Sequence, residues 1–598
     1  MQKNKYYKSR IAELEVEKGN SKKKSNIYSV TRLVFFIILT ILNIYAFNYV
    51  FLIGLVLLPI SIILFGLLVK YHNKKEEELN KFAQLISIYK NEIRNIKSEN
   101  IFGNGSQYID HKHLYTSDLD VFGKFSLYNL INRTITKNGS NILAKWLKQS
   151  STKNEIAQRQ NTVKELAKKI TFKEEFLRTF FYSKNNTNKN TSDLKEWIEN
   201  FEPYFTNKKT LIIYSWVSPI IILISFAIGY IYPLIWILTF IFISVNFIVL
   251  TGQQIKVNKI DIHLGKQADI FKRFSKLVSL IKNEDFKSDL ANRLKTELIG
   301  KYNPEKEFKK MAFISKRFDN RTNIFYRLLI LPIFMNDIHM SVSAEKWFVE
   351  NKKHINNWLE IIGEFDALLS LSILYFNNND WIFPEIVDAD FLIDGKELAH
   401  PLIPKETSIT NSYNISGKAK ADIITGSNMA GKSTFLRTIA VNMILAYAGA
   451  PVNAKSFKLS QIRILTYFRI HDSLEESTSS FYAELKRIRD ILNIIKTNDN
   501  CLLLLDELLR GTNTTDRNLG SVAIIKQFLK YNAVGIVATH DLSIADMIKQ
   551  FPEQVRNFNF DVNVKNDELF FDYKLKEGVC NSFNATLLMK KIGIDFDL

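Results

Sequence analysis

Two long apolar runs stand out in a chain whose other segments mix charged and apolar residues. Residues 33–69 and residues 210–255 contain no aspartate, glutamate, lysine or arginine. Because a helix needs about 20 apolar residues to span a bilayer, each run is long enough for two spans joined by a tight turn. Asn43–Asn48 and Gly229–Pro233 are the natural positions for these turns. The pattern therefore predicts four transmembrane helices in two hairpins, at residues 33–70 and 210–255.

Positive charge lies outside both predicted hairpins, and it sets their orientation. By the positive-inside rule the segments that carry these cations are cytoplasmic, which predicts a multi-pass protein of the inner cell membrane with cytoplasmic soluble domains. A cleaved signal peptide is not expected, because the first apolar run starts late and is too long. The alternative is that both runs form buried core hairpins in a soluble protein. The flanking cations are Lys22, Lys23, Lys24, Arg32, Lys70, Lys74, Lys75, Lys208, Lys209, Lys256 and Lys259.

The remaining patterns predict soluble helices and one α/β region. The apolar stretch "RLLILPIFM" at 327–335 contains Pro332 and is too short to span a membrane, so we expect it in a protein core. Residues 71–107 begin with a charged stretch of helical spacing, whose charge drifts from acidic to basic. Only the segment from about 380 to 598 is clearly α/β.

A glycine-rich loop, "ITGSNMAGKST" at 424–434, lies between a predicted strand and a predicted helix. It fits the pattern G-x-x-x-x-G-K-[ST], in which backbone N–H groups wrap phosphate oxygens, the lysine reaches the β- and γ-phosphates, and the hydroxyl binds Mg²⁺. A helix that begins directly after the loop would direct its N-terminus at the anion. The predicted phosphate-binding residues are Gly426, Ser427, Asn428, Met429, Ala430, Gly431, Lys432, Ser433 and Thr434, with Ser433 also a magnesium ligand.

Two further apolar strands end in residues suited to ATP hydrolysis. "CLLLLDELLRGT" at 501–512 places Asp506 to hold Mg²⁺ through water and Glu507 to polarise the attacking water. "AVGIVATHD" at 533–541 ends in His540, which would touch the γ-phosphate. Together with the loop, these strand ends predict a domain that hydrolyses ATP and depends on Mg²⁺.

The sequence around these motifs resembles the ATPase domain of the MutS family of DNA mismatch-repair proteins. The resemblance rests on Asn428-Met429, "SSFYAEL" (479–485), "DELLRGTNTTD" (506–516) and "ATHD" (538–541). Upstream, residues 118–166 look like the helical core domain of that family, 360–375 like the return of its lever helices, and 399–403 like the entry to the ATPase domain. The similarity covers roughly residues 108–170 and 340–595.

The resemblance implies an α/β P-loop ATPase domain of the ABC/MutS type and an all-α core and lever domain, to which the four predicted transmembrane helices are added. It also implies a homodimer through the ATPase domains, in which Ser479 of one subunit reaches the γ-phosphate bound by the other, and it implies DNA as a partner. The expected organisation is a basic tail (1–32), hairpin 1 (33–70), a charged helix or linker (71–107), a first core segment (108–209), hairpin 2 (210–255), the lever with a second core segment (256–379) and the ATPase domain (380–598).

Several features depart from the family pattern. The mismatch-recognition and connector domains are replaced by the tail, the first hairpin and a helix. Phe-x-Glu occurs at Phe348–Glu350 and Phe383–Glu385, in the wrong context for a wedge that reads mismatches. The aromatic residue that stacks on adenine in relatives is missing from 405–415 unless Tyr413 takes its place.

Composition agrees with this interpretation without deciding it. The 598 residues are enough for several domains. The net charge of +19 favours nucleic acid or an anionic membrane surface, although a solvated lysine-rich surface would give the same sum. Two cysteines imply no disulfide framework, which fits a reducing cytosol.

Two functions remain open at this point. The first is a membrane-anchored MutS-family ATPase that couples ATP binding and hydrolysis to DNA binding. The second is an ABC-like membrane transport or remodelling ATPase without DNA binding. The sequence favours the first, because an ABC transporter would show a Leu-Ser-Gly-Gly-Gln signature where this chain has "SSFYAEL", and would usually have six spans.

Overall fold

The computed structural model describes residues 2–93, 100–181, 203–300, 302–427, 429–468, 480–498, 500–565 and 568–580. Its contacts divide the chain into two compact units. Unit 1 comprises Met1–Ile101, Thr171–Asn283 and Asn303–His354, and unit 2 comprises Phe102–Ile170, Glu284–Tyr302 and Ile355–Leu598. This division falls inside the predicted core segments 108–209 and 256–379.

Unit 1 is helical. Its elements are α1 (Gln2–Tyr49), α2 (Phe51–Ile93), α6 (Ile170–Phe180), α8 (Lys209–Gly229), η3 (Pro233–Ile235), α9 (Trp236–Leu264), α10 (Ala268–Asn283), α12 (Pro304–Asp319), η4 (Asn320–Thr322), η5 (Tyr326–Ile330), α13 (Leu331–Phe334) and the first half of α14 (Asn336–Asn377). Four of these stretches, Lys3–Tyr49, Phe51–Ile93, Lys209–Gly229 and Pro233–Leu264, are long and apolar enough to cross a membrane, judged by length and composition alone.

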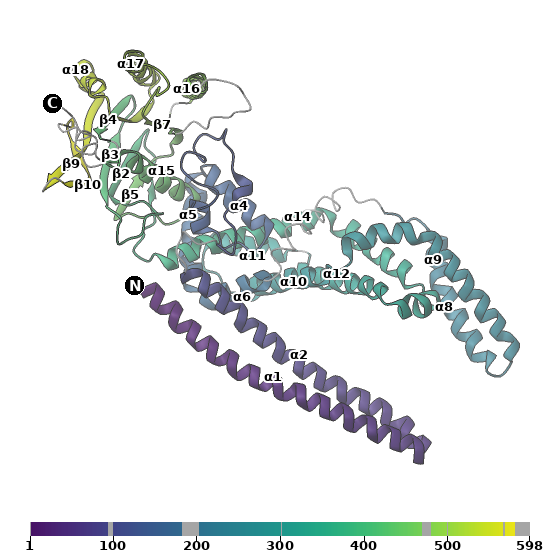
Figure 1. The fold of residues 1–598 in the computed structure, drawn as a ribbon. Coiled ribbons are helices and arrows are strands. Elements are labelled where there is room, and N and C mark those ends of the chain that lie inside the picture. The colour runs from purple at the N-terminus through teal and green to yellow at the C-terminus, as the bar shows by residue number, and fades with distance from the viewer. Residues whose placement is uncertain are drawn as a thin grey trace. The chain divides into compact units, whose positions relative to one another are not determined.

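Helices α1 and α2 lie side by side, as Figure 1 shows, and the chain reverses at Val50. The turn predicted at Asn43–Asn48 is therefore wrong. Asn43 lies within α1, where its amide donates to the carbonyl of Leu39 and to the hydroxyl of Ser61 on α2. Its polar group stabilises the contact between the helices instead of ending one. Residues of the predicted basic tail belong to the same helix as the first apolar run.

The second hairpin turns between Gly229 and Pro233, where the sequence predicts it. The short apolar segment at 327–335 differs from its prediction as a core segment. Only Leu331, Pro332 and Met335 are buried, while Leu328 and Leu329 are 58% and 59% exposed. The reason is that α13 packs against α8 and α9, while η5 contacts only α13 and η4 among the stronger contacts of the described residues, so most apolar side chains of the segment are exposed.

A buried carboxylate on α14 holds the approach to the second hairpin. The Glu345 side chain is fully buried and accepts hydrogen bonds from the backbone N–H groups of Tyr204, Phe205 and Thr206. A carboxylate that accepts several N–H groups satisfies them all at once where water is excluded. Unit 1 thereby fixes the chain just ahead of α8.

Unit 2 contains the α/β region. Its larger sheet has the order β10-β9-β4-β8-β7-β6, in which all neighbours are parallel except β10 and β9. The strands are β4 (Lys420–Gly426), β6 (Arg463–Tyr467), β7 (Cys501–Asp506), β8 (Val534–Thr539), β9 (Val555–Lys565) and β10 (Glu568–Glu577). All residues of β7 and β8 are buried, as expected for interior strands of a parallel sheet covered on both faces.

A smaller sheet has the order β1-β5-β2-β3, formed by β1 (Glu385–Ile386), β2 (Leu392–Leu398), β3 (Asn411–Ser416) and β5 (Ser456–Leu459). The helical elements of unit 2 are η1 (Ser106–Tyr108), α3 (Leu127–Ile131), α4 (Lys137–Lys148), α5 (Lys153–Lys168), α11 (Asp289–Ile299), α15 (Lys432–Ala448), α16 (Ser480–Thr497), α17 (Thr514–Lys530), η7 (Leu542–Asp546), α18 (Met547–Gln550) and the second half of α14. Helix α15 packs against α4 and α5, so the helical region of unit 2 supports the helix that follows the glycine-rich loop.

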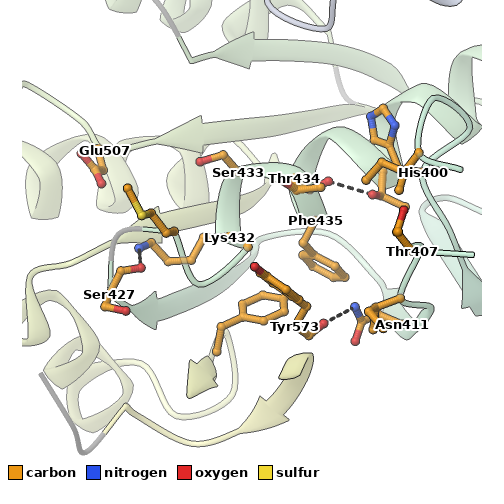
Figure 2. Close-up of a pocket in the computed structure, with 16 residues that line it drawn as sticks. His400, Thr407, Asn411, Ser427, Lys432, Ser433, Thr434, Phe435, Glu507 and Tyr573 are labelled. Carbon is orange, nitrogen blue, oxygen red and sulfur yellow. Dashed lines mark hydrogen bonds between the residues drawn. The ribbon is translucent and has the colours of Figure 1, made fainter. Parts of the chain in front are cut away.

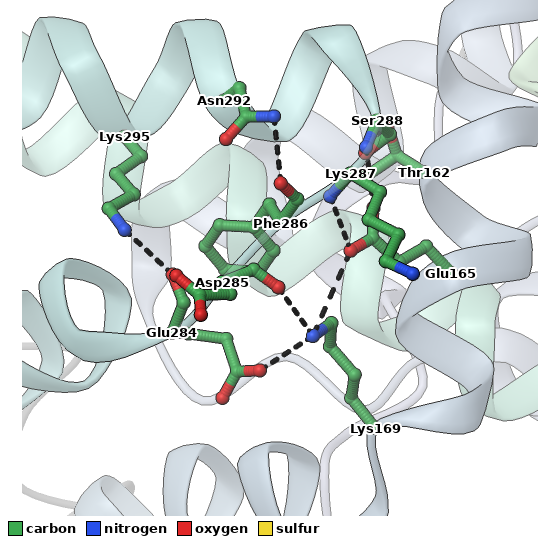
Figure 3. Close-up of polar contacts among 10 residues, drawn as sticks. All are labelled: Thr162, Glu165, Lys169, Glu284, Asp285, Phe286, Lys287, Ser288, Asn292 and Lys295. Atoms are coloured by element: carbon green, nitrogen blue, oxygen red, sulfur yellow. Dashed lines mark hydrogen bonds and ion pairs between the residues drawn. The ribbon is translucent and has the colours of Figure 1, made fainter.

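Two polar joints hold the helical region of unit 2 together. The buried Asp366 of α14 accepts from the backbone N–H groups of Ile135 and Thr136 and from the Thr136 hydroxyl, directly before α4. In the second joint, shown in Figure 3, Glu165 of α5 accepts from the N–H groups of Lys287 and Ser288 before α11.

The α5 joint also contains a cation. Lys169 donates to a Glu284 carboxylate oxygen at 2.6 Å and to the Asp285 carbonyl at 2.6 Å (Figure 3). These bonds connect segments that are more than a hundred residues apart in the sequence, and they anchor the short Glu284–Tyr302 insertion to the core of unit 2.

Candidate nucleotide-binding site

The glycine-rich loop connects β4 to α15 with backbone geometry that only glycine adopts easily. Gly426 has φ +150°, and a Cβ there would lie 2.7 Å from the carbonyl oxygen of Phe560. Gly431 has φ +104°, and a Cβ there would meet the ring of Tyr573 at 3.0 Å. Larger residues at these positions would combine backbone strain with steric clash.

Lys432, the first residue of α15, points back into the loop. Its ammonium donates to the carbonyl oxygen of Gly426 at 2.6 Å and to that of Ser427 at 2.9 Å, and Figure 2 shows the bond to Ser427. Burial lowers the pKa of Lys432, while the nearby carboxylates of Glu507 and Asp506 act in the opposite direction. The lysine is thus a largely desolvated cation held by neutral carbonyls, an arrangement that an anionic ligand would improve.

Asp506 is the last residue of β7 and Glu507 follows it; β8, the neighbour of β7, lies next to β4. Asp506 is buried, and this burial is the main cause of its raised pKa, while the neighbouring Ser433 hydroxyl acts in the opposite direction. Its Oδ1 atom is buried and has no hydrogen-bond partner among the described residues. A hydroxyl beside a carboxylate with a free oxygen is the kind of hard oxygen set that suits Mg²⁺.

Glu507 adopts φ +52°, and its N–H donates to the carbonyl of Ala538 on β8. Its carboxylate lies 3.1 Å from Nε of Arg510 and 3.7 Å from Nδ1 of His540. Asp506 also lies 3.8 Å from Arg510. The strand-end residues predicted from three separate motifs therefore do come together, and the structure adds Arg510, which sequence reasoning did not single out.

The loop borders a cavity of about 570 Å³, shown in Figure 2. Figure 2 shows Asn411 and Tyr573 in the wall on the side away from Glu507, and Ile409 also lines the cavity. Asn411 donates to the Tyr573 carbonyl at 3.0 Å and accepts from the Leu575 N–H at 2.9 Å, which fixes β10 beside the start of β3. The full lining is His400, Ile403, Thr407, Ile409, Asn411, Ser427, Met429, Gly431, Lys432, Ser433, Thr434, Phe435, Thr438, Glu507, Phe560 and Tyr573.

The aromatic residue considered for adenine stacking is not in this wall. Tyr413 is buried, and its hydroxyl donates to Asp422 at 2.6 Å, so it serves the interior of the domain. Tyr573 is 42% exposed and faces the cavity instead. It lies about 140 residues from the loop on an antiparallel edge strand, and no local motif marks it.

His400 also lines the cavity. Burial is the first cause that lowers the pKa of His400, to about 4, and the nearby Arg437 adds to the shift. The imidazole is therefore neutral at physiological pH. Its Nδ1 atom accepts from the N–H of Leu402, which orders the turn at the cavity edge.

Of the predicted site residues, Ser427, Met429, Gly431, Lys432, Ser433, Thr434 and Glu507 line the cavity. Gly426 and Ala430 belong to the same loop, and Asp506 and His540 contact Ser433 and Glu507 respectively. Asn428 and Ser479 lie outside the described residues.

Comparison with known proteins matches two family models to the chain. The model for MutS domain V matches residues 422–592, and the model for MutS domain III matches residues 111–372. Together they cover most of the chain, including the glycine-rich loop, both strand-end motifs and the helical segments on either side of the second hairpin.

Individual proteins that are similar to the chain are also MutS proteins. Human "MutS protein homolog 4" is 34% identical over 239 residues, which is 38% of this chain and 25% of the relative. "DNA mismatch repair protein MutS" of Persephonella marina is 30% identical over 263 residues, or 43% and 29% of the two chains. The protein of that name from Aquifex pyrophilus is 32% identical over 236 residues, or 38% and 27%. The chain thus spans less than a third of the length of these relatives.

Proposed function

The chain belongs to the MutS family, and from this premise we propose that it is a membrane-anchored, Mg²⁺-dependent ATPase that couples ATP binding and hydrolysis to DNA binding. The observation that carries the proposal is the meeting of Lys432, Ser433, Asp506 and Glu507 beside one cavity, at the ends of β4 and β7. A buried cation, a metal-type oxygen pair and a second carboxylate are the groups that phosphoryl transfer needs.

The loop would bind the triphosphate. Its backbone N–H groups and the N-terminus of α15 would surround the phosphate oxygens, and Lys432 would exchange its bonds to the Gly426 and Ser427 carbonyls for phosphate oxygens. Ser433 and Asp506 would hold Mg²⁺, which when bound neutralises phosphate charge. His540, close to Glu507, would touch the γ-phosphate.

Glu507 would polarise the attacking water. In the described state its carboxylate is engaged with Arg510, so catalysis requires this ion pair to loosen or turn toward solvent. The pair is half exposed at Arg510, which keeps its electrostatic contribution small and the rearrangement easy. The adenine base would lie at the opposite end of the cavity, between Tyr573 and Ile409.

The DNA and membrane components of the proposal have separate support. The relatives include DNA mismatch repair proteins, and the net charge of +19 suits a polyanion. Four helices have the length and composition of membrane spans. Phe348 is buried against Trp347, so the Phe348–Glu350 sequence offers no exposed aromatic wedge, and we expect weak preference for mismatches.

The test uses the detergent-solubilised chain and three variants. Lys432→Ala should abolish ATP binding, Glu507→Gln should bind ATP and fail to hydrolyse it, and Lys530→Ala, an exposed residue at the end of α17, should match wild type. Fluorescent-nucleotide titration and phosphate release measure the two steps. Equal ATP affinity in wild type and Lys432→Ala would contradict the assignment.

Anisotropy with matched and mismatched duplexes across a salt series tests the coupling to DNA. Binding should weaken steeply with salt, because phosphate contacts release counterions. Hydrolysis without any DNA binding at low salt would instead support an ATPase that acts on the membrane alone.

A further inference from the structure

We propose that residues 324–334 form a third membrane-embedded element of unit 1, a short re-entrant segment that lies against the α8–α9 hairpin with its outer side in lipid. This inference rests on the proposed membrane anchoring and extends it to a segment that is too short to span. Its partner is the acyl-chain region of the bilayer.

The first observation is the exposure of the segment's apolar side chains. Six large hydrophobic residues are exposed within eleven positions: Ile324 65%, Phe325 72%, Leu328 58%, Leu329 59%, Ile330 38% and Phe334 39%. Soluble surfaces rarely collect so many large apolar groups in one short stretch. The exposures are similar to those along the hairpin itself, where Leu223 is 52% and Ile224 54% exposed.

The second observation is how the segment is attached. Asn246 of α9 is fully buried, and its amide donates to the Pro332 carbonyl at 2.7 Å. The Asn246 carbonyl oxygen accepts from the hydroxyls of Tyr214 and Ser218 on α8. One asparagine thus joins three elements. Irregular backbone is tolerated at membrane depth only where protein satisfies its polar groups, and the bond from Asn246 does so for the carbonyl of Pro332.

The third observation is the expected depth of the segment in the bilayer. Asn246 precedes Lys256, the first cation after the apolar run, by ten residues, which corresponds to about 15 Å along a helix. The hydrocarbon core is about 30 Å thick. If Lys256 lies at the headgroups, as the charge pattern predicts, the Pro332 carbonyl lies near the middle of the bilayer.

The charges of the segment fit this placement. The only charged residue between 322 and 335 is Arg327, which is exposed and long enough to direct its guanidinium toward headgroups. Arg321, just before the segment, is engaged with Asp261 and Asp337. The chain therefore enters and leaves the apolar stretch beside paired charges, as a re-entrant segment with both ends on one side requires.

The test places an environment-sensitive fluorophore at single introduced cysteines in the full chain, reconstituted in liposomes of phosphatidylcholine and phosphatidylglycerol. The variants are Leu328→Cys in the segment, Leu223→Cys on α8 as the embedded reference, and Leu519→Cys, 64% exposed on α17, as the aqueous reference. Wild type carried through labelling measures the background from Cys501 and Cys580, which are both buried. Quenching is compared between lipids with nitroxide on the acyl chain and iodide in water.

We expect Leu328→Cys to follow Leu223→Cys, with lipid quenching at least about twofold stronger than iodide quenching, and Leu519→Cys to show the reverse. If position 328 follows position 519 while position 223 is quenched by lipid, the inference is overturned and the anchor stands. If position 223 is also unquenched by lipid, membrane anchoring itself fails. Protection of position 328 from both quenchers would show that a protein surface covers it, which also overturns the inference.

Discussion

At the scale of single residues, the first prediction concerns the role of Tyr573 in binding the base of ATP. Its ring lies over Gly431 and faces the cavity, so we expect Tyr573→Ala to weaken ATP binding by about tenfold, since stacking on a base is worth roughly 1–3 kcal/mol. Inorganic triphosphate, which has no base, should bind equally to wild type and variant. Tyr573→Phe should retain ATP affinity. If Tyr573→Ala weakened the binding of ATP and of triphosphate equally, Tyr573 would support the phosphate-binding loop and would not stack on the base.

A second prediction concerns the effect of Asp506 on the stability of the folded protein at different pH values. Burial raises the pKa of Asp506 in the folded protein above the value in the unfolded chain. The folded state then holds this proton more tightly, and its stability falls as pH rises from about 4 through the folded pKa. Asp506→Asn should therefore raise the thermal midpoint of nucleotide-free protein more at pH 7 than at pH 4.5.

Differential scanning fluorimetry in detergent measures this difference, with the exposed substitution Asp490→Asn as the control. Adding Mg²⁺ and ATP should stabilise wild type more than Asp506→Asn, since the variant lacks the carboxylate that would face the metal. A midpoint shift that is the same at both pH values would contradict the assigned role of the buried charge.

Some site residues belong to short continuous motifs that the sequence reveals, and others reach the site only through the tertiary structure. Lys432 and Ser433 belong to one continuous motif, and Asp506 and Glu507 end a continuous apolar strand, so sequence predicts both groups, and the parallel sheet brings them together. Tyr573 reaches the cavity through the pairing of β10 with β9 and the Asn411 contacts, which depend on tertiary register. Arg510 follows Glu507 by only three residues, but its contact with Glu507 is set by the turn after β7, where Glu507 and Leu509 both have positive φ, and the sequence carries no signal for that turn.

At the scale of elements, apolar runs are easier to find in the sequence than their turns and their surroundings. The prediction misplaces the hairpin turn near Asn43 because a polar residue can end a helix or bond across to its neighbour, and only the position of Ser61 decides between them. The prediction of a core position for 327–335 is wrong because a short apolar run carries no information about which side is covered.

The joint between α14 and α4 offers a test at this scale. Asp366→Ala would leave two backbone N–H groups and one hydroxyl buried without their acceptor, at a cost of at least about 2 kcal/mol. Gly139→Ala should also destabilise, because its Cβ would lie 2.4 Å from an Asp366 oxygen. Ser372→Ala on the same helix loses only a bond within α14 and should cost much less. Thermal unfolding measures all three, and similar midpoints for Asp366→Ala and Ser372→Ala would contradict this role.

At the scale of the whole molecule, the chain builds two units from interleaved segments. Helix α14 contributes to both, with Glu345 holding the approach to α8 in unit 1 and Asp366 holding the approach to α4 in unit 2. The sequence pattern could not show this interleaving, because a local pattern does not tell which distant segments pack together. The two buried carboxylates mark the contacts that assign each half of the helix to its unit.

The last prediction concerns two copies of the chain. We expect ATP hydrolysis to require a dimer, with Ser479 of one subunit acting on the γ-phosphate bound by the other. Ser479 lies outside the described residues, and α16 begins directly after it at Ser480. A hydroxyl and a helix N-terminus placed this way would stabilise phosphate charge. Membrane spans would favour pairing, because they confine the chains to a plane and raise their effective concentration.

Mixing Lys432→Ala chains with Ser479→Ala chains separates action between subunits from a local role. In the mixed dimer one composite site carries both substitutions and the other carries neither, so activity should partly recover although each variant alone is inactive. If Ser479 only caps α16, Ser479→Ala should lower stability and leave turnover per folded molecule nearly unchanged. Lack of recovery in dimers proven to contain both chains would rule out action across the interface.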